Sequence, residues 1–227
     1  ASVSGTTVVN VVRGDTNAVL DGTTVKKGSV SVKANDTNTL NSILGGITAS
    51  GVAAVSGYVN ENNVVNTTSA KITNSTIGSE DQRADAVEVK ASSTNNIAAM
   101  SASVGVAGSG ANVQGLGVLN QNTALTEAKI ENSSITASSL DVEAKNTFNV
   151  FDLIAAAGVA GQGAQIGGNV ISNVVNNDLT AAITGSKDNI IDISGTSNVN
   201  AESNITMGNA LASAGISGCL LYTSPSP

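Results

Sequence analysis

The chain repeats itself with a long period, and this repeat constrains its fold more than any other feature. A Val-x-Ala pattern occurs four times, and a glycine follows each alanine seventeen positions later. The alanines lie 57, 53 and 57 residues apart. Because the copies agree over distance, each is a structural unit that stacks on the next. The alanine–glycine pairs are Ala34 and Gly51, Ala91 and Gly108, Ala144 and Gly161, and Ala201 and Gly218.

A second set of positions gives the same period. Leu20, Ile72, Ile130 and Ile183 are equivalent, and each follows an asparagine by ten residues and a glycine by fifteen. Stacked units would align the asparagines as an internal ladder at a bend, with their amides bonded to backbone or to each other. An asparagine-lined ligand site is the alternative. The asparagines are Asn10, Asn62, Asn120 and Asn173; the glycines, Gly5, Gly57, Gly115 and Gly168, are expected at structural turns, as are Gly51, Gly108, Gly161 and Gly218.

The segments between glycines predict strands. Apolar and polar residues alternate with period two in 30–34, 87–91 and 140–144, and the glycines and β-branched residues disfavour helix. Two residues after each anchor comes Gly22, Asn74, Asn132 or Gly185, which predicts a turn with positive φ. The sequence therefore predicts an all-β parallel solenoid over 1–218, with four repeats of which the first and last are incomplete. We expect two coils per repeat, hence about eight coils spanning roughly 40 Å.

Composition excludes several function classes. Aromatic residues make up 2% of the 227 residues, which suits a thin core repeated along an axis, and the net charge of −7 argues against nucleic acid as a partner. No apolar run is long enough for a membrane helix, so no membrane insertion is expected. The segment 219–227 holds the only cysteine and both prolines. It looks like a translated sequencing adapter, and we expect it to be unstructured and not part of the fold.

The repeats differ in length at one corner. The distance from anchor to alanine is 14 residues in units one and three, but 19 and 18 in units two and four. The insertions fall in 78–85 and 185–194, and in solenoids such loops often form the binding side. Solvated loops without a function are the alternative. Their charged residues are the candidates for partner contact and, through clustered acids, for weak calcium binding. These candidates are Glu80, Asp81, Arg83, Asp85, Lys187, Asp188 and Asp192.

No catalytic constellation is evident. The chain has no histidine, and its only cysteine is in the adapter-like segment, so the usual triads and zinc sites lack their base or ligands. A β-helix enzyme acting on polysaccharides would need paired carboxylates, whereas the acids here are scattered. We therefore expect neither an enzyme nor a cofactor, and keep a polysaccharide-active enzyme as the less favoured alternative.

The pattern from Ala124 to Ala137, followed by Leu140-Asp141-Val142-Glu143-Ala144, resembles the repeats of leukotoxin-type filamentous adhesins, which are filamentous-haemagglutinin-like large bacterial exoproteins. The resemblance extends over residues 1 to 218. It implies a right-handed parallel β-helix, export by an autotransporter or two-partner secretion route, an extracellular or cell-surface location, and a virulence role in cell adhesion or host-cell damage. The expected function is a shaft or spacer whose partners are the neighbouring repeats. Direct binding to host receptor or matrix through the insertion loops is the alternative.

Overall fold

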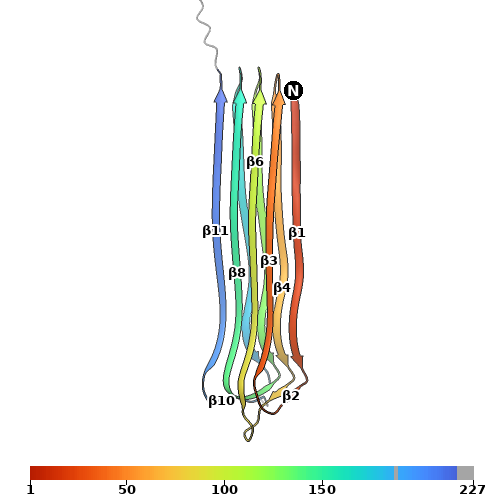
Figure 1. The fold of residues 1–227 in the computed structure, drawn as a ribbon, viewed down its shortest axis with the longest axis vertical. Coiled ribbons are helices and arrows are strands. Elements are labelled where there is room, and N and C mark those ends of the chain that lie inside the picture. Colours follow the sequence, from red (N-terminus) through yellow and green to blue (C-terminus); the bar gives the residue numbers. More distant parts are fainter. Residues whose placement is uncertain (187–188, 219–227) are drawn as a thin grey trace, which may run out of the picture.

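The computed structural model describes residues 1–186 and 189–218, which form an all-β structure of parallel strands without helix. Two sheets lie face to face (Figure 1). The first contains β1 (Ser2–Asp21), β4 (Ala54–Thr73), β7 (Asn112–Glu131) and β9 (Gln165–Thr184). The second contains β3 (Val30–Ser50), β6 (Ala84–Ala107), β8 (Ser134–Ala160) and β11 (Ser197–Ser217), with short strands β2 (Thr24–Val25), β5 (Thr76–Ile77) and β10 (Ile191–Ile193) at one corner. The predicted parallel β-solenoid is confirmed.

Each repeat forms one coil, so the expectation of two coils per repeat is wrong. Asn62 pairs with Asn10 on one side and with Asn120 on the other, at a separation of one full repeat. The reason is strand length: the long strands run for 20 to 27 residues without a bend, so half a repeat makes one strand. Four coils at 4.8 Å each span about 19 Å along the stacking axis, whereas a 20-residue strand spans about 66 Å.

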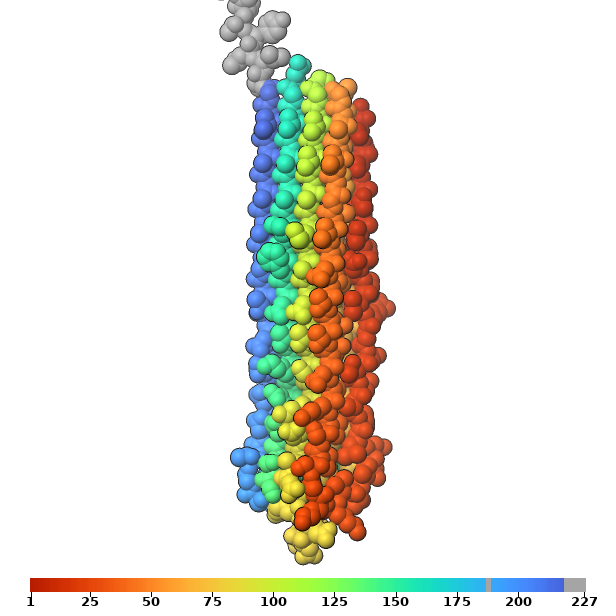
Figure 2. Space-filling view, viewed as in Figure 1, coloured from red at the N-terminus to blue at the C-terminus, as the bar shows by residue number. Residues whose placement is uncertain are grey.

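The coil is right-handed, as the resemblance implies. In Figure 1 the strands of the second sheet run upwards in front, those of the first run downwards behind, and successive coils advance from right to left. Figure 2 shows the coils as adjacent bands over the whole length of the strands. The right-handed twist of strands favours this hand in almost all parallel crossovers.

The core lies between the sheets and changes in character along the strands. Every second residue of β4 and β7, of β6 from Val87 on and of β8 from Leu140 on, points inwards and is buried. Towards the corner that holds the short strands the core is aliphatic, with Ile72, Ile130 and Val89 at its centre. Phe148 and Val64 fill the middle, and Ile154 and Val118 lie beyond them. Small aliphatic residues suffice because only one layer of side chains from each sheet fills the gap.

Both ends of the strands turn as the sequence requires, with one exception. Gly22, Asn74 and Asn132 have φ of 61°, 50° and 49°, which confirms the predicted positive-φ corner. The backbone N–H of Asn74 donates to the Glu131 carbonyl of the next coil at 3.1 Å. Gly185 does not have a positive φ, because the backbone of the fourth repeat departs here from the path that the other three repeats share.

The two glycine columns have different roles. Gly51, Gly108 and Gly161 lie in the turns at the opposite end of the strands, with Gly218 directly after β11. A Cβ on Gly161 would lie 2.1 Å from the Gly108 carbonyl oxygen, so stacking of the turns requires glycine. The other column was expected at turns and is not there: Gly5, Gly57, Gly115 and Gly168 lie inside β1, β4, β7 and β9. A Cβ on Gly57 would meet nothing within 4 Å.

Candidate functional site

The four equivalent asparagines form a continuous ladder inside the solenoid. Each side-chain amide donates from Nδ2 to the Oδ1 of the next coil: Asn10 to Asn62 at 2.9 Å, Asn62 to Asn120 at 2.8 Å, and Asn120 to Asn173 at 2.7 Å. The ladder lies in mid-strand and not at a bend, because each asparagine is an inward-facing residue of the first sheet. A buried amide column satisfied by its own members stabilises the stack and leaves no donor directed at a ligand.

A carboxylate that sequence reasoning missed completes this ladder. Asp152 of β8 is fully buried and accepts from Asn120 Nδ2 at 2.7 Å and from Asn173 Nδ2 at 2.8 Å. Burial raises the pKa of Asp152 above its ordinary value, while the two amide donors act in the opposite direction. Its inward direction was legible in the sequence, since Asp152 shares the parity of Phe148, Val150 and Ile154.

A second polar network lies one layer further along the strands. Asn95 of β6 donates across the core to Asn66 at 3.1 Å and to Asn122 at 3.0 Å. Asn122 in turn donates to Asn177 at 2.7 Å, which donates to Asn146 at 2.9 Å. The network therefore ties the two sheets together as well as successive coils.

The insertions lie at one corner, as expected, but leave the coil at different points. Residues 78–83, the first insertion loop, replace Thr136 of the third coil, because Ile77 and Ala84 flank them and pair with Ile135 and Ala137. The second insertion precedes β10, which pairs with β8. Glu80 and Asp81 are exposed in the first loop, Asp85 and Asp192 lie in strands, and Lys187 and Asp188 lie outside the described residues.

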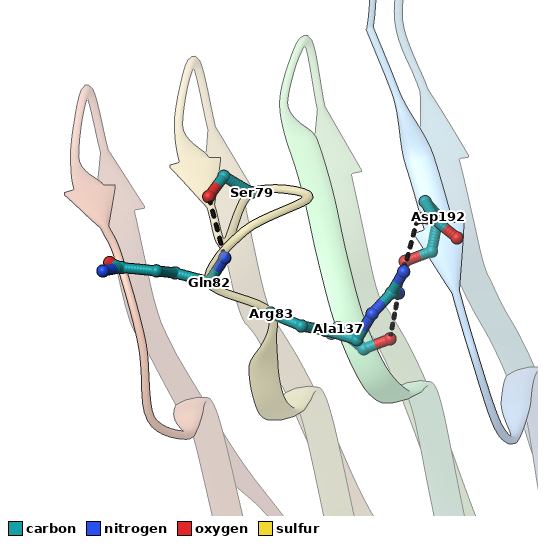
Figure 3. Close-up of polar contacts among 5 residues, drawn as sticks. All are labelled: Ser79, Gln82, Arg83, Ala137 and Asp192. Carbon is teal, nitrogen blue, oxygen red and sulfur yellow. Dashed lines mark hydrogen bonds and ion pairs between the residues drawn. The ribbon is translucent and has the colours of Figure 1, made fainter.

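Arg83 connects three coils at this corner (Figure 3). Its guanidinium donates to the Ala137 carbonyl of the third coil at 3.0 Å, and to the Asp192 carbonyl and carboxylate of the fourth at 2.9 and 2.6 Å. Within the first loop, the backbone N–H of Gln82 donates to Ser79 Oγ at 3.2 Å. Two of the predicted partner residues, Arg83 and Asp192, thus bond to each other, and their contact stabilises the fold.

Charged side chains on the outer face of the second sheet also pair along the stack. Lys90 Nζ lies 2.6 Å from Asp141 Oδ2 of the next coil, and Lys33 Nζ lies 2.8 Å from Glu88 Oε2. The hydrogen bond to Asp141 raises the pKa of Lys90, and the bond to Lys90 lowers the pKa of Asp141. These pairs are partly exposed, so each contributes little stability.

Among residues 1–186 and 189–218, no group of three or more Asp, Glu, Cys or His gathers in a geometry that would hold a metal ion. Glu80, Asp81 and Asp85 are therefore not brought together as calcium ligands. The same residues include no helix that could cross a membrane. Comparison of the chain with protein-family models, curated proteins and solved structures gives no match.

Proposed function

We propose that this chain is a shaft segment of a secreted bacterial surface adhesin or filamentous exoprotein, with no catalytic role. One observation carries the proposal: the asparagine that recurs in every unit bonds to its own equivalent in the next coil. Such residues stabilise coil on coil. A repeat array of this kind has the same interface at each step, so its length follows from the number of repeats.

The sheet edges support the same proposal. The strands β1 and β3 at one end and β9 and β11 at the other have a neighbour on one side only in the described structure. Unpaired strand edges accept further strands, so additional coils can continue the stack in register. Because one coil uses 53 residues, as in 112–164, and advances about 4.8 Å, the shaft is wide and its length is modest for its mass.

The test inserts ten further copies of residues 112–164 into the chain displayed on a bacterial surface with an epitope at its far end. A shaft predicts that the epitope moves outwards by about 48 Å, measured by fluorescence localisation against a membrane label. An unchanged height in a folded, exported protein would overturn the proposal.

Direct binding through the insertion loops is tested separately. Replacing residues 78–83 by the single threonine of the third coil shortens the corner to a length that the solenoid already accepts. Saturable binding of the purified chain to host cells or matrix that is lost in this variant would establish the binding function instead. Turnover of a polysaccharide by the purified chain would establish the enzyme.

A further inference from the structure

The outer face of the second sheet is divided along its strands into a charged half and an apolar half. The charged half carries Lys33, Glu88, Lys90, Glu143 and Lys145. The apolar half, here called the apolar plate, consists of the outward residues in the last ten positions of β3, β6, β8 and β11. These are Asn41, Ile43, Gly45, Ile47 and Ala49; Ala98, Met100, Ala102, Val104 and Val106; Phe151, Leu153, Ala155, Ala157 and Val159; and Gly208, Ala210, Ala212, Ala214 and Ile216. None is charged, and only Asn41 is polar.

In this part of β6 the outward residues are more apolar than the inward ones. Ser101 and Ser103 of β6 point into the core and are almost fully buried, while their neighbours Met100 and Val104 point outwards and are 42% and 44% exposed. Ile47 is 79% exposed. The hydrophobic effect predicts the reverse for a rod surrounded by water. This inversion is expected if the plate is itself covered.

We infer that the apolar plate packs against the same plate of a second copy of this chain. Its twenty positions lie about 6.6 Å apart along the strands and 4.8 Å apart between strands, so the plate covers about 630 Å². When a two-fold axis lies between Leu153 and Ala155, sixteen of the twenty positions of each plate overlap, so two copies bury about 1,010 Å², which clears the roughly 1,000 Å² expected of a biological interface. One plate exceeds the largest apolar patch of most monomers. Each copy has a net charge of −7, and the plate is the part of this face where that charge is absent.

The side chains of the plate complement themselves about one axis. Paired outward residues of the four strands form rows that run along the stacking direction. A two-fold axis parallel to these rows, midway between the row of Leu153 and the row of Ala155, places each of these two rows opposite the other. Phe151 then lies opposite Ala157. In the second coil the same axis places Met100 on Ala102 and Val104 on Ala98, so a large side chain meets a small one in the second and third coils. Packing of ridges into a small-residue row lets the two sheets approach closely.

A lipid surface fits the plate less well than a second copy does. Segments that bind membrane interfaces combine apolar residues with Lys, Arg and Trp at their margins. The only aromatic side chain of the plate is Phe151, and the lysines on the same face, Lys33, Lys90 and Lys145, each pair with a carboxylate. Shallow hollows on the plate, such as the one lined by Gly45, Ile47, Ala102 and Val104, are open to side chains of an opposing sheet.

The test is sedimentation velocity of the Cys219→Ser chain and of two substitutions on the same face of β6. Ala102→Glu places a charge at the centre of the plate, and Ser92→Glu places the same charge on the charged half as the matched control. We expect a concentration-dependent dimer for the parent and for Ser92→Glu, and a dissociation constant at least about 100-fold higher for Ala102→Glu. Ala155→Glu provides a second variant in the third coil, and circular dichroism checks that each variant keeps its strand content.

A parent chain that remains monomeric would overturn the inference. Dimerisation that is equal in Ala102→Glu and Ser92→Glu would also overturn it, because end-to-end association through the strand edges does not involve the plate. Flotation of the parent with phosphatidylcholine vesicles, lost in Ala102→Glu, would assign the plate to a lipid surface instead. The shaft proposal stands or falls separately, since it concerns the axis of the stack and not its outer face.

Discussion

Replacing Asn120 by alanine tests the structural role of the asparagine ladder. Asn120 is 2% exposed and makes three side-chain hydrogen bonds, one from Asn62 and one each to Asp152 and Asn173. Asp152 and Asn173 keep one another, but the Nδ2 of Asn62 loses its acceptor inside the core and the Oδ1 of Asn173 loses its donor. Since each buried group left without its partner costs about 1–3 kcal/mol, we expect these two losses to lower the stability of the variant by roughly 2–6 kcal/mol.

The measurement is urea denaturation followed by far-ultraviolet circular dichroism. With a slope of roughly 2–3 kcal/mol per molar urea, the loss lowers the midpoint by about 1.5 M. The control is Asn149→Ala in the same coil, because Asn149 faces outwards and donates one bond to Asn96 at 2.9 Å. Its midpoint should stay within about 0.4 M of the parent, as expected for loss of one partly exposed bond. Equal midpoints for the two variants would refute the ladder as a source of stability.

Three further predictions concern other parts of the coil. Because burial raises the pKa of Asp152, ionisation of this group destabilises the fold. Asp152→Ala should therefore gain stability relative to the parent as the pH rises above 3.8, and the gain is measured as the difference between the two urea midpoints. A difference that is constant with pH would contradict this. Arg83→Ala should speed amide hydrogen exchange in 191–193 by about tenfold or more and barely change the urea midpoint of the whole chain. Unchanged exchange would show that Arg83 does not stabilise this corner. Gly161→Ala should lower the melting temperature by several degrees because its Cβ would meet the Gly108 carbonyl, whereas Gly57→Ala should not, and equal effects would show that the two glycine columns do not differ.

The sequence was sufficient to predict the stacking but not the path of one coil. A match between Asn62 and Asn120 fixes which residues become neighbours, whatever lies between them, because equivalent side chains of a solenoid must align. The number of bends within a repeat depends on where the backbone turns. Gly57 looked like a turn since glycine is usual there, yet its φ is not positive and it lies within a 20-residue strand. Period-two alternation continues through it, and this was the better signal.

In the candidate site, too, some features were predictable from the sequence and others were not. The corner that varies in length was predictable from the spacing of the repeats, because insertions are tolerated where the backbone is solvated. The pairing of Arg83 with Asp192 was not, since these residues are 109 positions apart and belong to coils separated by a third. The inverted polarity of β6 was harder to predict. Ser101 and Ser103 share the parity of the inward residue Val89, but their polarity alone would have placed them on the outer face.

Disulfide formation between successive repeats tests most directly whether one repeat makes one coil. Thr94 of β6 and Thr147 of β8 are paired residues on adjacent strands, so cysteines at both positions, in a Cys219→Ser background, lie within the span of a disulfide. The structure predicts rapid intramolecular oxidation of this pair in the folded chain, and none when Thr94→Cys is combined with Gln121→Cys, half a repeat further on in the opposite sheet. Oxidation of the second pair in place of the first would mean that each repeat contains two coils.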